Sequence, residues 1–348
     1  MENFELSCPI QKSNFDRVLL AHGSGGTLSH NLVKDIFLPY FGNNYLNVLH
    51  DGAILNNSNK KLAFTTDSYV VNPLFFPGGN IGDLAINGTV NDLAMCGALP
   101  KYISCGFIIE EGFLINNLIE IIKNMKIAAD KAGVKIVTGD TKVVENGKGD
   151  GIFINTSGIG FIDEGINISA NNCKPGDVIL INGFIAEHGM AIMSVRNGFE
   201  FESPIISDTA ALNGLVADML NVSKNIHVLR DPTRGGIAST LNELAESSNV
   251  GILIDENTIP ISDTVKAACE ILGFDPLYVA NEGKLIAFLA PEEAEKVLGV
   301  MKTHPLGIHS RIIGEVVCEN QGMVIMKTEI GSSRIVDMLT GEQLPRIC

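Results

Sequence analysis

Five aspartates stand beside glycine, threonine or asparagine at the edges of apolar segments. They are Asp51 in "LHDGAIL", Asp67 in "FTTDSYVV", Asp92 in "VNDLAMCGA", Asp140 in "TGDTKVV" and Asp231 in "LRDPTRGG". Each one alone is most simply a turn or helix-capping residue. If such carboxylates gather in space, they make a hard-oxygen site for Mg²⁺ with nucleotide phosphates. Spacing along the chain does not decide whether they gather.

A glycine-rich segment near the N-terminus is a second candidate for phosphate binding. In "HGSGG" at 22–26, the backbone N–H groups around Gly23, Gly25 and Gly26 could fold over a phosphate. No segment matches the Walker A pattern. A flexible loop without a ligand explains this segment equally well.

Single residues of other types are weaker candidates. Cys348 ends the chain in "GEQLPRIC", and a frayed terminus that happens to finish in cysteine is its plain alternative. Glu282 in "VANEGKL" and Lys142 in "GDTKVV" could act in proton transfer, although such residues more often form surface ion pairs. His22 and His188 could be acid–base groups, but as lone histidines they carry little weight.

Composition narrows the class of protein. A net charge of −15 argues against a nucleic-acid partner, because phosphate backbones require a basic face. The absence of tryptophan argues against a stacking platform for single-stranded nucleic acid. The N-terminus lacks the regions of a signal peptide, and no apolar run approaches the roughly 18 residues of a membrane span. Seven cysteines without CxxC spacing fit reduced thiols better than a disulfide framework. We therefore expect a cytoplasmic protein with no membrane partner.

Short apolar runs and amphipathic stretches alternate in both halves of the chain, which predicts two α+β domains. The clearest helix is 113–133, with an apolar stripe of Ile115, Leu118, Ile119, Ile122 and Met125. Other helices are expected at 80–98, 186–196, 208–221, 234–248, 261–273 and 292–302. Strands are expected at 61–71, 102–109, 134–144, 151–162, 177–183, 226–231, 251–256, 284–290, 310–317 and 322–328.

The Pro-Gly-Asp turn within 171–177 suggests a domain boundary. The expected organisation is a flexible glycine-containing segment at 1–30, an N-terminal domain at 31–170, a C-terminal domain at 171–330 and a mobile tail at 331–348 ending in Cys348.

Eight short segments of the chain, taken together and in order, resemble those of a known family. They are "AHGSGG", "DGAIL", "TTDSYVV", "NGTVNDLAMCGA", "TGDTKVV", "DPTRGG", "ANEGKL" and the terminal "PRIC". In this order they closely resemble the HypE family of hydrogenase maturation factors, in the aminoimidazole ribonucleotide synthetase-like (PurM-like) superfamily. The aspartate segments are shared in kind with selenophosphate synthetase and thiamine-monophosphate kinase. The "PRIC" ending is what singles out the hydrogenase family, and the likeness runs from about residue 15 to the end.

The resemblance implies a PurM-like two-domain fold whose N-terminal domains pair into a homodimer through a joint β-barrel. It implies that ATP with Mg²⁺ binds near that interface, with the glycine loop closing over the nucleotide. The implied ATP-binding residues are Gly23, Gly25, Gly26, Asp51, Asp67, Asp92, Asp140 and Asp231, of which Asp51, Asp67, Asp92 and Asp231 would also bind the metal.

The resemblance also implies an activity. A partner carbamoyltransferase, HypF, would load Cys348 with a carbamoyl group, and ATP would drive its dehydration to a thiocyanate. The cyano group would then pass to iron on a HypC–HypD complex during maturation of a NiFe-hydrogenase. Glu282 would take protons from nitrogen, and Lys142 would orient the group or stabilise charge. A tail of 18 residues from Gly331 to Cys348 could span at most roughly 60 Å, so one thiol could visit both sites.

Two other readings remain open from the sequence. One is another ATP-dependent PurM-like enzyme that acts on a small molecule. A selenophosphate synthetase would carry a reactive cysteine in the glycine loop, and "HGSGG" has none. The other is a thiol-bearing metal chaperone or scaffold without enzymatic activity, which the unpaired cysteine spacing disfavours. Metal binding without ATP hydrolysis would favour the chaperone.

Overall fold

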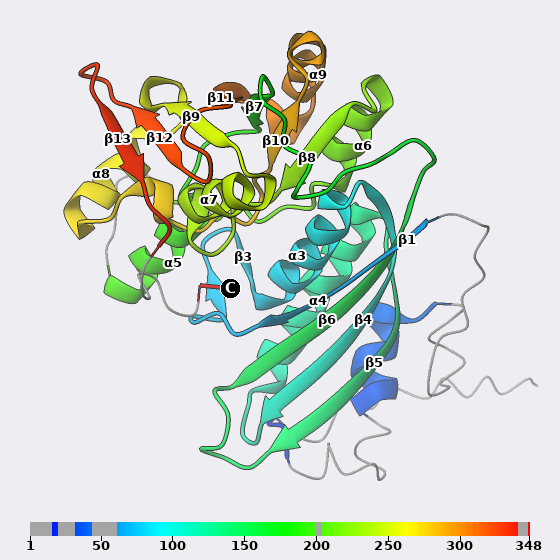
Figure 1. Ribbon diagram of the computed structural model, residues 1–348. Coiled ribbons are helices and arrows are strands. Elements are labelled where there is room, and N and C mark those ends of the chain that lie inside the picture. Colours follow the sequence, from blue (N-terminus) through cyan, green and yellow to red (C-terminus); the bar gives the residue numbers. More distant parts are fainter. Residues whose placement is uncertain (1–15, 20–31, 44–60, 199–203, 340–346) are drawn as a thin grey trace, which may run out of the picture.

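The structure is a computed structural model in which two α+β halves stack, with the C-terminus at their junction (Figure 1). It describes residues 16–19, 32–43, 61–198, 204–339 and 347–348. The predicted glycine loop at 22–26 and Asp51 lie outside these ranges, as does His22.

The N-terminal half is built on a four-stranded sheet in the order β1-β6-β4-β5. Its strands are β1 (Lys61–Tyr69), β4 (Ala98–Glu110), β5 (Lys135–Val144) and β6 (Ile152–Ile162). Helices α3 (Ile81–Met95) and α4 (Ile115–Ala132) lie together on one face of the sheet (Figure 1). The parallel pair β4 and β5 is joined through α4, as a crossover connection requires.

Helix α4 forms where the sequence predicts it. Ile115, Leu118, Ile122 and Met125 are buried, because their spacing places them on one face of the helix. Gly133 ends the helix with φ of 70°, a left-handed conformation that glycine adopts without strain.

The C-terminal half is built on a seven-stranded sheet in the order β13-β12-β9-β11-β7-β10-β8. The strands are β7 (Val178–Ile181), β8 (Ile226–Arg230), β9 (Gly251–Asp255), β10 (Ile286–Leu289), β11 (Arg311–Val317), β12 (Val324–Lys327) and β13 (Ser333–Val336). The helices are α5 (Glu187–Asn197), α6 (Asn213–Val222), α7 (Gly236–Ser248), α8 (Asp263–Leu272) and α9 (Pro291–Thr303).

Both faces of strand β10 in the seven-stranded sheet are buried. Along β10, Ile286 and Phe288 join the apolar cluster that includes residues of α5, α7 and α8. Ala287 and Leu289 point the other way and join the cluster that includes residues of α6 and α9. This second cluster also contains Ala94 and Met95 of α3, so it ties the two halves together.

The remaining regular elements are short. They are the π-helical turn η2 (Val33–Phe37), α2 (Leu38–Phe41), the hairpin strands β2 (Phe75–Phe76) and β3 (Gly79–Asn80), and the 3-10 turns η4 (Glu256–Thr258), η5 (Pro276–Tyr278) and η6 (Pro305–Gly307).

Three sequence expectations need correction. The helix expected at 208–221 begins only at Asn213, because the Asn91 side chain bonds to the Ala210 carbonyl and the Leu212 N–H just before it. The expected tail at 331–348 contains the edge strand β13, which pairs with β12. Within the expected flexible segment at 1–30, the described residues 16–19 are anchored, since Val18 is fully buried and its backbone bonds to Phe113 and Gly112.

The expected β-barrel is not present among the described strands, where the four-stranded sheet is open. The face of this sheet away from α3 exposes large apolar side chains, including Leu62, Phe64 and Ile108. Pairing of two such sheets in a homodimer stays a prediction.

No helix in the described ranges has the length and apolar character needed to cross a bilayer. The six cysteines there are all free thiols.

Candidate active site

Helix α3 carries Asp92 into the junction between the halves. The helix starts with a capping box, in which Asn80 accepts from the Gly82 N–H and Asp83 accepts from the Asn80 N–H. Near its other end, the buried side chain of Asn91 donates to the carbonyls of Ala210 (3.0 Å) and Glu282 (3.1 Å). Asn91 therefore connects the helix that bears Asp92 to the segment that bears Glu282.

Strand β1 carries Asp67 on the sheet face that α3 covers. Asp67 pairs in register with Thr156, which is fully buried on that face. Two residues earlier, Thr65 donates a 2.8 Å hydrogen bond to the Asp92 carboxylate. The strand and the helix thus bring Asp67 and Asp92 to one place.

Asp231 follows β8 directly, in the "DPTRGG" loop. Asn281 fixes this loop by donating to the Pro232 carbonyl at 2.8 Å. The loop then turns into α7 through Gly236, which has φ of 61° and packs so closely that a Cβ would lie 2.4 Å from the Leu277 carbonyl oxygen. Only glycine fits this turn.

Glu282 lies in the segment before β10 and is 4 % exposed. Its backbone N–H and that of Gly283 both donate to the buried Asp208 carboxylate, at 3.1 and 3.2 Å. Lys284 pairs with Asp208 at 2.9 Å and with Glu187 at 3.2 Å. Among the described residues, Glu282 Oε1 has no hydrogen-bond partner. The network holds the Glu282 backbone and leaves its carboxyl group available for chemistry.

The carboxylates at this junction perturb one another. Burial raises the pKa of Asp231 to about 7, and the neighbouring Asp92 adds to the increase. Burial likewise raises the pKa of Asp92, even though Thr65 donates to it. The pKa of Glu282 lies well above its ordinary value because of burial and the negative charges of Asp208 and Asp231. The cluster is therefore short of positive charge.

The C-terminal cysteine lies within this cluster. The Val70 N–H donates to the Cys348 terminal oxygen at 3.3 Å, and His188 Nε2 lies 2.9 Å from the Ile347 carbonyl oxygen. Burial raises the pKa of the Cys348 thiol, Glu282 raises it further and Arg234 opposes the increase. The half-buried Cys348, beside the buried Ile347, contradicts the plain alternative of a frayed terminus.

The structure thus brings together five of the predicted site residues: Asp67, Asp92, Asp231, Glu282 and Cys348. It adds residues that the sequence interpretation missed or gave little weight. Arg234 belongs to the quoted "DPTRGG" segment, and its charge was the signal that could have found it. His188, Asp208 and Lys284 act through contacts between distant segments, which no local pattern reveals.

Asp140 and Lys142 lie elsewhere in this chain. They form an exposed ion pair on β5 at 3.1 Å. Asp140 pairs in register with Gly106, and Gly106 with Asn155, which pairs with Ser68 rather than Asp67. Because directly paired residues point to the same sheet face, both side chains lie on the face opposite α3. Within one chain, the structure does not bring them to the carboxylate cluster.

The described residues contain no group of three His, Cys, Asp or Glu side chains placed to bind a metal by themselves. Magnesium, however, is commonly held by one or two carboxylates together with substrate phosphates and water. The raised pKa values of Asp92 and Asp231 fit such a shared cation, because added positive charge would relieve their repulsion.

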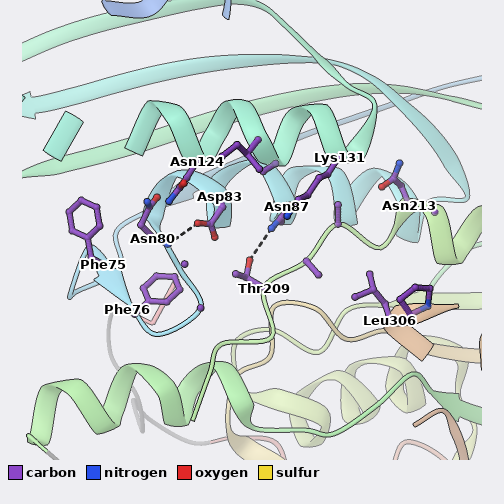
Figure 2. A pocket seen from close by; sticks show the side chains of 18 of the residues that line it. Phe75, Phe76, Asn80, Asp83, Asn87, Asn124, Lys131, Thr209, Asn213 and Leu306 are labelled. Atoms are coloured by element: carbon purple, nitrogen blue, oxygen red, sulfur yellow. Dashed lines mark hydrogen bonds between the residues drawn. The ribbon is translucent and has the colours of Figure 1, made fainter. Parts of the chain in front are cut away.

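A cavity of about 1040 Å³ lies near this site but is separate from it. Figure 2 shows it between α3, α4 and the segment at 209–214, with Asp83, Asn87 and Lys131 along its wall. Asn87 donates to Thr209 at 3.2 Å across one side. The cavity is lined by none of the five clustered site residues.

Comparison with known proteins identifies the family. Two family models match, "AIR synthase related protein, N-terminal domain" over residues 49–162 and the corresponding C-terminal domain over 174–327. Carbamoyl dehydratase HypE of Rhizobium leguminosarum bv. viciae is 52 % identical over 95 % of each chain.

Solved structures agree with this assignment. A HypE structure in complex with ATP superposes with a TM-score of 0.92 at 49 % identity, covering 95 % of this chain and 99 % of that one. A structure of a HypE–HypF complex superposes with a TM-score of 0.78 at 50 % identity, covering 88 % and 99 %. The fold is therefore the PurM-like α+β fold. The chain belongs to the HypE family of carbamoyl dehydratases, among the AIR synthase-related proteins.

Proposed function

We propose that this protein is an ATP-dependent carbamoyl dehydratase that converts an S-carbamoyl group on its own Cys348 into a thiocyanate. The product would supply the cyanide ligand for iron during hydrogenase maturation. The single observation that supports this best is the position of Cys348. The Val70 N–H, three residues after Asp67, donates to its terminal oxygen at 3.3 Å, and Glu282 raises the pKa of its thiol.

The proposed reaction has two steps, phosphorylation of the carbamoyl oxygen and elimination of phosphate. The carbamoyl oxygen attacks the γ-phosphoryl group of ATP and releases ADP, which turns a poor leaving group into a phosphate ester. Removal of the two N–H protons and cleavage of the C–O bond then give S–C≡N and inorganic phosphate. The former carbamoyl oxygen ends on the phosphate.

Glu282 is the proposed base for the nitrogen protons. A carboxylate with a raised pKa accepts a proton more readily than an ordinary one. Its free oxygen atom and its effect on the pKa of the Cys348 thiol support a position near the carbamoyl group that this thiol would carry. Burial also keeps water away from an activated intermediate that would otherwise hydrolyse.

The nucleotide and its cation are proposed to bind at the carboxylate cluster. The ATP-bound relative supports the nucleotide, and the electrostatics of Asp92 and Asp231 support a magnesium ion beside it. When bound, Mg²⁺ would neutralise the phosphates and hold the γ-phosphoryl group in line with its acceptor. Asp67 would complete the described ligands. Asp51 and the glycine loop with Gly23, Gly25 and Gly26 are proposed to contribute as the resemblance of their segments implies.

Asp140 and Lys142 are proposed to act across a homodimer. Their sheet face also exposes Phe64, which is 64 % exposed, and Ile108, which would be covered by a second sheet. An exposed apolar face of this kind favours self-association. Lys142 of one copy would then stabilise charge in the site of the other.

HypF and the HypC–HypD complex are the proposed partners, one to load Cys348 and the other to receive the cyano group. The solved HypE–HypF complex of a relative supports the first. We further propose domains near 31–170 and 171–330, a tail that moves Cys348 between site and partner, and a cytoplasmic location.

The mass of the C-terminal peptide tests this function. The chain is incubated with HypF, carbamoyl phosphate and MgATP and then digested. Cys348 is expected to gain about 43 Da and then to fall to a net gain of about 25 Da, the change from carbamoyl to cyano on a sulfur nucleophile. The second step should require ATP hydrolysis.

The same digest contains its own control. Cys318 is exposed, so any unspecific modification would appear on its peptide. An unmodified Cys348 with active partner enzymes would leave an ATP-using PurM-like enzyme of another substrate as the better assignment.

A further inference from the structure

The last two residues of the chain make buried contacts and hydrogen bonds with the body of the protein. Ile347 is 2 % exposed and belongs to an apolar cluster with Phe76 of β2 and Ile192 of α5. The terminal residue is therefore tied to both halves of the molecule through its neighbour. A tail that must also reach a partner needs a contact that can be made and broken.

His188 supplies a directional contact to this tail. It is fully buried on α5, its ring packs edge-on against Phe76 at 5.5 Å, and its Nε2 lies 2.9 Å from the Ile347 carbonyl oxygen. A carbonyl oxygen accepts only, so Nε2 must carry the proton. Burial lowers the pKa of His188, which keeps the ring neutral with one N–H to donate.

Ser207 selects that form of the ring. Its hydroxyl lies 2.7 Å from His188 Nδ1, and the same oxygen accepts from the Thr209 N–H at 3.2 Å. With its lone pair engaged by Thr209, the hydroxyl donates to Nδ1, and Nε2 keeps its proton for Ile347. Ser207 is itself fixed by its backbone N–H, which donates to the Pro77 carbonyl at 2.8 Å.

We infer that His188, oriented by Ser207, is a positioning residue that holds the C-terminal tail in the active site through the Ile347 carbonyl. This inference rests on the proposed function, in which the tail moves Cys348 between a partner and the active site. The contact with His188 would hold the tail in its active-site position. Neither residue touches the reacting atoms. Together they set the fraction of time that Cys348 spends beside Glu282.

Alkylation of the unmodified chain by iodoacetamide tests the inference, with each cysteine followed by peptide mass. Cys348 should react more slowly than the exposed Cys318 in the unchanged protein. His188→Ala should speed Cys348 alkylation about tenfold, the usual effect of losing one buried hydrogen bond. Ser207→Ala should act in the same direction but more weakly, because the ring would lose the hydrogen bond that orients it, although Nε2 would keep its proton.

Two substitutions and one residue serve as controls. His188→Gln keeps an N–H near the Nε2 position and should recover most of the protection. His309→Ala changes an exposed histidine of the same domain and should leave Cys348 unchanged. Cys105 is buried in the N-terminal core and must stay unreactive, which shows that each variant is folded. Equal Cys348 alkylation rates in the unchanged protein, His188→Ala and Ser207→Ala would overturn the inference.

A second measurement separates this inference from the proposed function. In chains already carbamoylated by HypF, His188→Ala should slow the single-turnover dehydration step while loading stays as fast or becomes faster. Equal slowing of both steps would indicate a general defect and would count against a positioning role. If the unchanged chain cannot be carbamoylated at all, the proposed function fails, and the alkylation comparison still decides whether His188 holds the tail.

Discussion

The Asn91 side chain donates a 3.1 Å hydrogen bond to the backbone carbonyl of Glu282, 191 residues later in the chain. This contact fixes the helix that carries Asp92 relative to the segment that carries the proposed base. Asn91 is 1 % exposed and is satisfied on both its amide nitrogen and its oxygen. It is a structural element of the site without being part of the chemistry.

Replacement of Asn91 by alanine should therefore damage both stability and activity. Two buried backbone groups and one part-buried one would lose their partner, and we expect the free energy of unfolding to fall by about 2–3 kcal/mol. Urea denaturation measures this loss. Asn146→Ala removes an amide that bonds to Glu111 at an exposed turn, and it should cost less than about 0.5 kcal/mol. Equal effects of the two substitutions would contradict a special role for Asn91.

Glu282→Gln should stop dehydration and leave nucleotide binding intact. Loss of a positioned general base typically costs about 10²–10⁴ in rate. Single-turnover conversion of carbamoylated Cys348 measures the chemical step, and calorimetric titration with MgATP measures binding. Glu292→Gln on the exposed surface of α9 is the matched control and should behave as the unchanged chain. A normal dehydration rate in Glu282→Gln would remove this residue from the mechanism.

Asp231 gives a pH dependence whose sign follows from its raised pKa of about 7. The folded chain binds this proton more tightly than the unfolded chain does, so the favourable contribution is fully present below about pH 4 and is lost as the pH rises through 7. Asp231→Asn mimics the protonated form. Without nucleotide, it should match the unchanged chain near pH 4 and exceed its stability by about 1–2 kcal/mol at pH 8.

Urea unfolding at the two pH values checks this sign. Asp218→Asn, on the exposed face of α6, should show no such difference between the two pH values. The stabilised Asp231→Asn variant should nevertheless bind MgATP poorly. The negative charge of Asp231 that repels Asp92 in the free chain is the charge that would attract the cation. A variant that is less stable than the unchanged chain at pH 8 would refute this account of the cluster.

The exposed sheet face predicts a dimer that a single charge should break. Phe64 is 64 % exposed on β1, and Phe64→Glu would place a carboxylate in the centre of the apolar face. Light scattering after size exclusion should report a dimer for the unchanged chain and a monomer for the variant. Ile330→Glu, at a position 90 % exposed in the other half, should remain dimeric.

Complementation tests whether Lys142 acts on the second copy's site. Lys142→Ala and Glu282→Gln should each be inactive alone. If the two residues of one site come from different copies, mixed dimers carry one intact and one doubly defective site. Equal mixing should then restore about a quarter of the sites, as two-fold symmetry requires. No recovery in a mixture that does exchange subunits would place Lys142 outside the neighbouring site.

The local sequence determined most of the secondary structure. Helix α4 followed from its apolar spacing and the glycine after it, and both features act over only a few residues. The helix expected from residue 208 began late because its first residues bond to Asn91, which lies in the other half of the chain. A contact of that range overrides local propensity and leaves no local pattern.

The residue types of the site could likewise be predicted from the sequence, whereas their positions in space could not. The residue types at Asp67, Asp92, Asp231, Glu282 and Cys348 were readable from the sequence, since each stands in a short distinctive segment. Their meeting was decided by the tertiary structure, through backbone pairing of β1, the capping of α3 and the Asp208 contact to Glu282. The tertiary structure also separated Asp140 from Asp67, because strand register sends neighbouring residues to opposite faces. It alone gave His188 a role, since a buried histidine acquires one only from the partners that fold around it.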